Sequence, residues 1–183
     1  MKYIFLVLAA IIFFGACTSN AKEVIPAAPV SVADANKLIK GKRYSTIKLG
    51  VLSPFIYDTA NPVNWQIQKE DTSKFFRDYA TKQLTFTLIF SNDSACTYFD
   101  TDNDKIINGT YSIDNDAKLG YDEEKPGIKL RIKYADSLDF GGVKTAAAMT
   151  QSFLIQGIND KELLLQTSRS INNRKLVVWM KQQ

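Results

Sequence analysis

Histidine is absent from this sequence, and cysteine occurs only at positions 17 and 96. Without histidine the chain cannot build a Ser-His-Asp or Cys-His nucleophile, the usual zinc and iron sites, or an imidazole proton relay. The chemistries that remain are a carboxylate pair, a lysine base and a calcium site made entirely of oxygen ligands. The sequence therefore favours a binding or structural role over catalysis.

The sequence also lacks a large excess of either charge, because it has 23 basic and 19 acidic residues and a formal net charge of only +4. This balance is too mild to indicate a nucleic-acid partner. Nearly all acidic residues fall in turns, and none stands alone in an apolar strand where its pKa would rise far enough for acid catalysis. We therefore set aside a carboxylate enzyme acting on envelope glycans, and we expect no enzymatic activity and no cofactor.

The chain has no hydrophobic run long enough for a bilayer, since the apolar stretch at residues 3–14 falls short of the roughly 20 residues that a spanning helix needs. Lys2 precedes this stretch, and Phe14-Gly15-Ala16-Cys17 follows it, which is the layout of a secretory signal. These four residues resemble the lipobox of bacterial lipoproteins, whose cysteine is lipidated and becomes the N-terminus after cleavage. The alternatives are ordinary secretion and a retained anchor.

The resemblance implies that residues 1–16 are a signal peptide and that lipid on Cys17 holds the protein to a membrane of the bacterial cell envelope. The outer membrane is favoured, and the face that carries the protein stays open. Residues 17–30, with Pro26 and Pro29, are then expected to form the lipidated cysteine and a flexible tether. Residues 31–183 have the length of one domain.

Cys96 is left alone in that domain, so no internal disulfide is expected. It lies in a stretch where apolar and polar residues alternate, which predicts a small buried side chain rather than a reactive thiol.

Regular structure is predicted to begin with a short helix over residues 32–40, capped by Ser31 with Asp34 and ended by Gly41. A second helical turn is expected over residues 72–80. The remaining signals are those of β-strands, in which apolar and polar residues alternate between turns. The predicted strands are residues 42–49, 84–90, 95–100, 107–113, 128–134, 151–158, 162–168 and 175–181.

These eight strands are joined mostly by tight turns, so neighbours in the sequence should pair antiparallel. The predicted fold is all-β, an eight-stranded antiparallel up-and-down barrel with a short N-terminal helix, because closure removes exposed edges. A β-sandwich is the alternative. The connection at residues 135–150 is expected to be a long loop and a candidate mobile lid.

The acidic run Asp100-Thr101-Asp102-Asn103-Asp104-Lys105 has the spacing of the first half of a calcium loop. Its second half fails, since Lys105 stands where glycine is needed and Tyr111 stands where a bidentate glutamate is needed. A solvated hairpin turn is the better interpretation, and no metal site is expected.

Several segments together resemble the lipocalin-like lipoproteins common in Bacteroidetes-type bacteria. They are Leu38-Ile39-Lys40-Gly41-Lys42, Leu84 to Phe90, Asn108-Gly109-Thr110-Tyr111, and IQGINDKELLL at 155–165 ahead of Val177-Val178-Trp179. The resemblance covers most of the chain after the tether. It implies a calycin-like barrel that binds a small apolar or amphiphilic ligand and performs no catalysis.

Aromatic residues are the candidates for a ligand mouth or lining, and each is also a candidate for a solid core. They are Tyr44, Trp65, Phe75, Phe76, Phe86, Tyr98, Tyr111 and Phe153. The alternative function is an envelope protein–protein interaction module with a filled barrel, whose working surface would be the long loops or the basic face of Lys129, Arg131 and Lys133.

Overall fold

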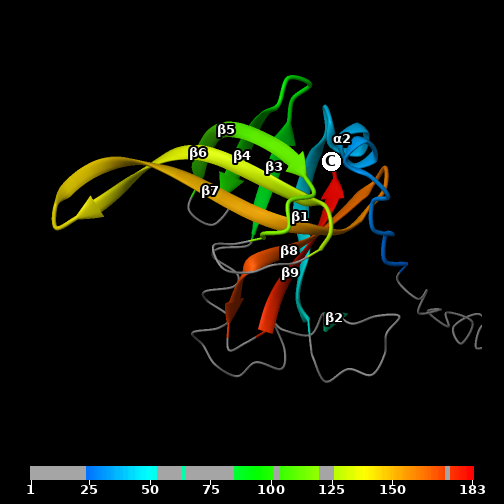
Figure 1. Cartoon of the computed structure of the whole chain (residues 1–183). Helices are drawn as coiled ribbons and strands as arrows, with labels where there is room; N and C mark the ends of the chain where they lie inside the picture. The colour runs from blue at the N-terminus through cyan, green and yellow to red at the C-terminus, as the bar shows by residue number, and fades with distance from the viewer. Residues whose placement is uncertain (1–23, 53–62, 65–84, 101–103, 120–125, 172–173) are drawn as a thin grey trace, which may run out of the picture.

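The computed structural model describes residues 24–52, 63–64, 85–100, 104–119, 126–171 and 174–183. One helix and nine strands lie in these ranges (Figure 1). They are α2 (Val32–Ile39), β1 (Arg43–Leu52), β2 (Val63–Asn64), β3 (Phe86–Phe90), β4 (Ala95–Asp100), β5 (Lys105–Asp114), β6 (Lys129–Phe140), β7 (Val143–Ile158), β8 (Glu162–Ile171) and β9 (Arg174–Gln182). The helical turn expected over residues 72–80 lies outside the described residues, as does the signal segment.

The strands form a closed antiparallel barrel. Each of β3 to β8 pairs with the next strand in sequence, β1 pairs with β3, and β9 returns to pair with β1 from Tyr44↔Gln182 to Leu52↔Lys175. The two-residue β2 only extends the edge of β1. The prediction of an all-β, eight-stranded barrel with a short helix is confirmed, and the pairing of β1 with β9 excludes the sandwich.

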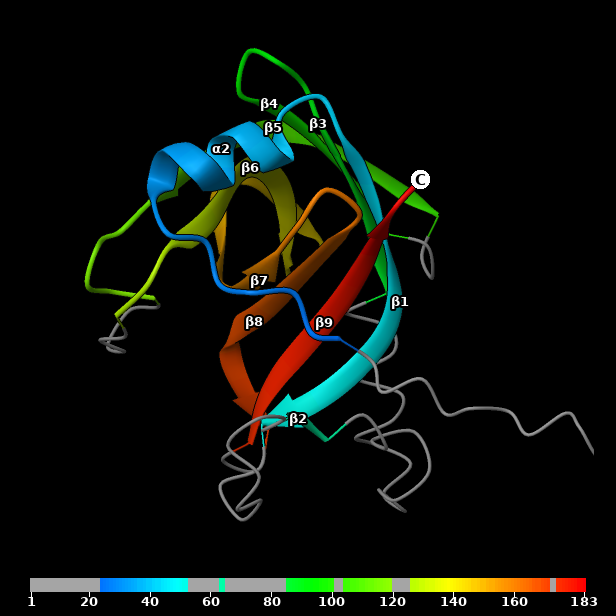
Figure 2. The ribbon, with the colours of Figure 1, turned by 90° about the vertical axis from the view of Figure 1, so that its right-hand side faces the viewer.

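Helix α2 covers one end of the barrel (Figure 2). The Ser31 hydroxyl accepts a hydrogen bond from the Asp34 backbone N–H at 3.1 Å, which is the capping interaction that the sequence predicts. Ala35 and Ile39 face the barrel and are buried. Tyr44 follows on β1, and its hydroxyl donates to the Leu38 carbonyl at 3.1 Å, so helix and first strand are joined directly.

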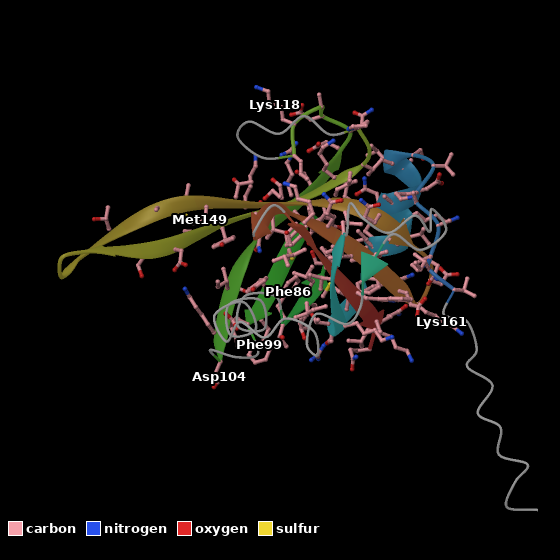
Figure 3. The ribbon with its side chains drawn as sticks, turned by 90° about the horizontal axis from the view of Figure 1, so that it is seen from below. Phe86, Phe99, Asp104, Lys118, Met149 and Lys161 are labelled. Carbon is pink, nitrogen blue, oxygen red and sulfur yellow. The ribbon has the colours of Figure 1, made fainter. Side chains whose placement is uncertain are left out.

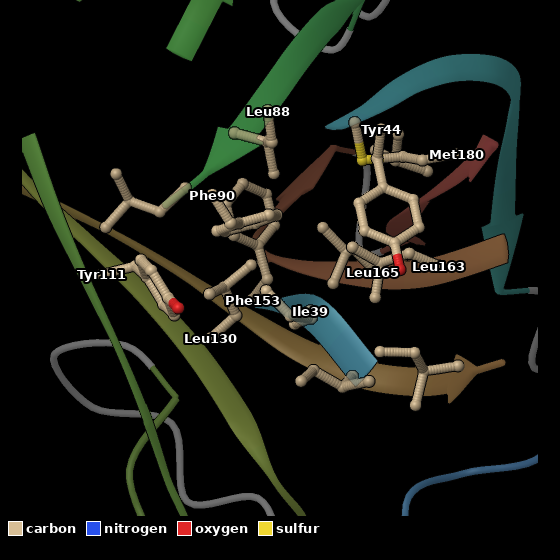
Figure 4. Close-up of a cluster of buried hydrophobic side chains, with 14 of the residues drawn as sticks. Ile39, Tyr44, Leu88, Phe90, Tyr111, Leu130, Phe153, Leu163, Leu165 and Met180 are labelled. Atoms are coloured by element: carbon tan, nitrogen blue, oxygen red, sulfur yellow. The ribbon is translucent and has the colours of Figure 1, made fainter. Parts of the chain in front are cut away.

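The interior beneath α2 is filled by side chains (Figure 4). Phe90 meets Tyr111 edge to face with ring centroids 4.9 Å apart, and Tyr44 lies 6.3 Å from Phe90. Aliphatic side chains from β3, β6, β8 and β9 close the remaining space, among them Leu88, Leu130, Leu163, Leu165 and Met180. Aromatic pairs and aliphatic burial of this kind stabilise the fold mainly through the hydrophobic effect.

Residues 25–27, called the N-terminal strap, lie on the outside of the barrel ahead of α2 (Figure 2). The Ala27 carbonyl accepts a hydrogen bond from the Ile158 N–H at 2.9 Å, and Ile25 packs on an outer apolar cluster of Leu164, Val177 and Trp179. Pro26 is buried. The tether was expected to reach residue 30, and these contacts hold residues 25–27 of it against the barrel wall.

The segment predicted to be a lid differs from expectation. Residues 135–152, called the hairpin arm, are the outer halves of β6 and β7, paired without interruption from Ala135↔Ala148 to Phe140↔Val143. Gly141 and Gly142 form the turn, with φ of 65° and 93°. The arm extends away from the barrel as a two-stranded ribbon (Figure 1). The lid interpretation is therefore wrong.

Candidate functional site

A concave site of about 460 Å³ opens at the end of the barrel opposite α2. Its walls come from the ends of five consecutive strands, β4 to β8. The lining residues are Tyr98, Asp100, Lys105, Ile107, Tyr134, Asp136, Met149, Thr150, Gln151 and Ser168. The helix end is closed by packed side chains, whereas this cavity has room for a ligand.

The position of the cavity follows from strand register. The β3–β4 turn lies at the helix end, where the Phe90 N–H donates to the Lys42 carbonyl at 2.9 Å. The β4–β5 turn therefore lies at the opposite end, and there Asp100 pairs with Lys105. β4 and β5 are therefore paired directly on both sides of the acidic run, of which residues 101–103 lie outside the described residues.

The floor of the cavity is aromatic. Tyr98 stacks on Phe86 with ring centroids 5.0 Å apart, and Phe86 lies 5.9 Å from Phe153. Phe86 and Phe153 are buried, whereas Tyr98 retains 8% exposure and forms part of the lining. Tyr98 brings its ring to the cavity lining, and Phe86 and Phe153 join that ring to the solid core.

The rim is polar and holds an ion pair. The Lys105 ammonium donates to both carboxylate oxygens of Asp136, at 2.8 and 2.9 Å. This hydrogen bond, with a smaller contribution from the Ser137 N–H, lowers the pKa of Asp136 below its ordinary value. The ion pair joins β5 to β6 past the end of their backbone pairing. The last backbone pair toward the cavity is Gly109↔Tyr134.

The lining combines apolar surface with hydrogen-bonding groups. Ile107 and Met149 add to the aromatic floor, while Gln151, Thr150 and Ser168 add neutral polar groups. Among the described lining residues, two carboxylates, Asp100 and Asp136, accompany one ammonium, that of Lys105. An arrangement of this kind can hold an apolar body against the floor and a neutral or cationic polar group at the rim.

The structure places the aromatic ligand candidates in two environments. Tyr98 lines the cavity, and Phe86 and Phe153 lie directly beneath it. Tyr44 and Tyr111 lie in the core under α2, where the Tyr111 hydroxyl donates to the Ser91 carbonyl at 3.2 Å. Burial raises the pKa of Tyr44 to about 12, as expected for a phenol removed from water.

Four predicted site residues lie outside the described residues. They are Cys17, Trp65, Phe75 and Phe76.

Sequence reasoning missed most of the cavity lining. Lys105, Tyr134, Asp136, Met149 and Gln151 were not singled out as site residues, because Lys105 was assigned to a turn and residues 135–150 to a loop. The register of β5 and β6, which only the structure shows, brings Lys105 and Asp136 to the same end of the barrel when one counts outward from the paired residues Gly109 and Tyr134.

The basic face expected on β6 is not an open cationic surface. Lys129 is buried, and its ammonium donates to the Gly127 carbonyl at 2.8 Å. Arg131 forms an ion pair with Asp114 at 2.7 Å and a longer one with Asp116 at 3.5 Å. Lys133 alone of the three stays exposed. That expectation is wrong, because cross-strand acidic partners neutralise Arg131 and burial removes Lys129 from the surface.

Cys96 is buried with 3% exposure, as its alternating stretch predicts, and burial raises the pKa of its thiol to about 12. Among the described residues, no three acidic or cysteine side chains gather closely enough to hold a metal ion. The same part of the chain contains no helix with the length and apolarity to span a membrane.

The chain matches no protein-family model, and comparisons with curated proteins and with solved structures likewise return no match.

Proposed function

We propose that this protein is a membrane-anchored, lipocalin-like lipoprotein that binds a small amphiphilic ligand at the end of its barrel opposite α2. The observation that supports this proposal is the cavity of about 460 Å³ with an aromatic floor and a polar rim. Ligand pockets in proteins have volumes of roughly 300–1,000 Å³ and combine an apolar lining with a few polar groups. The lipobox-like segment ending at Cys17 supports the membrane anchor.

The charge of the rim narrows the class of ligand. A fatty-acid carboxylate at the rim would meet Asp100 as well as Asp136, and like charges in a partly enclosed site repel. An alcohol, amide or amine head avoids this repulsion and can donate to the carboxylates. We therefore expect an amphiphile with a neutral or cationic head to bind more tightly than a fatty acid of the same chain length.

The test is to purify residues 18–183 gently and to compare the native mass with the denatured mass. A reproducible extra mass that extracts into organic solvent is the expected result, and it identifies the ligand. A fluorescent alkyl amine and a fluorescent fatty acid of equal chain length then measure the preference for the head group. An unliganded mass together with no binding of either probe would refute the proposal.

A matched pair of variants locates the site. Met149→Trp adds volume inside the cavity and should weaken probe binding, whereas Met149→Leu preserves the volume and should leave binding nearly unchanged. Met149 lies near the base of the hairpin arm, away from the packed core under α2 (Figure 3). Equal binding by both variants would show that the probe occupies another place.

The second candidate function is an envelope protein–protein interaction module. The specific observation that favours it is the filled interior under α2, where Tyr44, Phe90 and Phe153 leave no room for a ligand. Unliganded protein in the mass measurement would favour this function.

A further inference from the structure

The hairpin arm has two free backbone edges in the part of the chain that the structure describes. Toward β5, the pairing of β6 stops at Gly109↔Tyr134. Toward β8, the pairing of β7 starts only at Phe153↔Thr167. Among the described residues, residues 135–140 of β6 therefore pair only with residues 143–148 of β7, and residues 149–152 of β7 pair only with residues 131–134 of β6. Unpaired N–H and C=O groups along such an edge are a template for another strand.

The two edges differ in chemistry. The β6 edge spans residues 135–140 and carries Asp136. Pairing two copies along it would bring the two Asp136 carboxylates onto one short edge, and charged residues are one of the devices that protect edges from association. Asp136 is also engaged by Lys105. The β6 edge is thus poorly suited to self-association.

The β7 edge lacks this protection. Residues 143–152 read VKTAAAMTQS, with Lys144 as the only charge and no proline. Thr145, Ala146, Ala148 and Thr150 are exposed. Small side chains on both faces allow close approach of a second strand without steric conflict.

We propose that the β7 edge of the hairpin arm pairs antiparallel with the same edge of a second copy of this chain, with Ala147 on the two-fold axis. A two-fold axis perpendicular to a sheet leaves every side chain on its own side of the sheet. Residues that pair across the axis must lie on the same side, so the axis passes through a residue that pairs with its own copy. Centring on Ala147 aligns residues 143–151 of the two strands. Ala146 then faces Ala148 of the second copy, and Lys144 faces Thr150.

This register avoids both the repulsion of like charges and steric conflict between the two strands. No like charges are opposed, because position 144, the only charged position of residues 143–151, is paired with Thr150 in this register. The strands run in opposite directions, so the two barrels lie at opposite ends of the joined ribbon. Figure 3 shows that the arm extends beyond the barrel wall, which leaves both of its sides accessible along the ribbon.

The inference concerns a surface distinct from the ligand cavity, and it does not depend on ligand binding. It also explains why a β-ribbon would persist away from the barrel. An isolated two-stranded hairpin is only marginally stable in water, whereas a sheet of three or more strands is stable. Pairing two arms edge to edge creates a four-stranded sheet.

The first test is disulfide crosslinking of the full chain in its membrane. Ala147→Cys places the two thiols opposite each other at the axis, and oxidation should give a reducible dimer. Ser137→Cys on β6 is the matched control, because it is also exposed on the arm but lies on the protected strand. Cys96 is buried and should not contribute. No dimer from Ala147→Cys, or an equal yield from Ser137→Cys, would overturn the proposal.

The second test changes charge in the same Ala147→Cys background. Adding Ala146→Lys with Ala148→Lys opposes like charges at two symmetric positions, and the crosslinking yield should fall to background. Adding Ala146→Lys with Ala148→Glu opposes unlike charges, and the yield should return to at least that of Ala147→Cys alone. Unfolding curves of both variants should match, since both side chains are exposed. Equal yields from the two charge variants would also overturn the proposal.

Discussion

At the scale of single residues, the ion pair between Lys105 and Asp136 is the interaction most closely tied to the cavity. It joins β5 to β6 at a point where the two strands no longer pair through their backbones. The Lys105 side chain is 48% exposed, so solvent screens the pair and its contribution to stability is about 1 kcal/mol or less. Its larger role is to fix the position of a carboxylate at the rim.

The lowered pKa of Asp136 gives a pH-dependence prediction. A carboxyl whose pKa is lower in the folded state contributes stability above its unfolded pKa, ordinarily 3.8, and loses it as the pH falls through the folded pKa. Asp136→Asn should therefore unfold more easily than wild type at neutral pH, by up to about 1 kcal/mol, and the difference should vanish below the folded pKa. Urea unfolding across the acidic range measures this.

Lys105→Met is the control for this prediction, because it removes the same pair from the other side. It should show the same loss at neutral pH. A difference between wild type and Asp136→Asn that stays constant from neutral to strongly acidic pH would contradict an origin in the ion pair.

At the scale of elements, the sequence predicts strands well where one face is buried. Leu88 and Phe90 alternate with exposed or polar neighbours, and Leu130 and Ile132 do the same on β6, so their strands and inward faces could be predicted. The hairpin arm could not, because Ala146, Ala148 and Thr150 have no buried face to produce alternation. Backbone pairing with β6 forms that ribbon, and register is not visible in a single sequence.

The candidate site was harder to predict than the fold for a related reason. Tyr98, Phe86 and Phe153 could be predicted as inward aromatic residues of strands, and they form the cavity floor. The rim depends on which ends of β5 and β6 meet, and that depends on cross-strand register. Register likewise decides that Arg131 faces Asp114 and is not free for a partner.

The N-terminal strap gives a prediction at this scale. A Cβ atom on Gly157 would lie 2.0 Å from the Pro26 carbonyl oxygen, a distance that requires the backbone to move. Gly157→Ala should therefore displace the strap from β7, at a cost of about 1–3 kcal/mol in the free energy of unfolding. Hydrogen exchange at the Ile158 N–H, which donates to Ala27, should become faster.

Gly109→Ala is the matched control for the strap. A Cβ atom there would lie 2.2 Å from the Lys133 carbonyl oxygen, so this variant should also be less stable. Because Gly109 lies on β5, its substitution should leave the exchange protection of Ile158 close to that of wild type at low denaturant. Equal acceleration at Ile158 in both variants would show that the strap merely follows global stability.

At the scale of the whole molecule, the barrel is divided along its axis. The end under α2 is filled by packed side chains, and the opposite end holds the cavity and carries the hairpin arm. This separation lets one end provide stability while the other end carries the surfaces available for binding. The strap restrains the chain ahead of the helix, since it fixes residues 25–27 to the wall formed by β7, β8 and β9.

The strap also limits how far the barrel can lie from a membrane anchor at Cys17. From Cys17 to Ile25 there are 25 − 17 = 8 residues, which span at most about 27 Å when fully extended. We expect wild-type protein in the membrane fraction and Cys17→Ala in the soluble fraction, because in our proposal lipid on this cysteine is the anchor. The unfolding curve of the soluble variant should match that of wild type, since the described fold begins after the lipidation site. Retention of Cys17→Ala in the membrane fraction after a salt wash would refute the lipid anchor and place the membrane contact elsewhere on the chain.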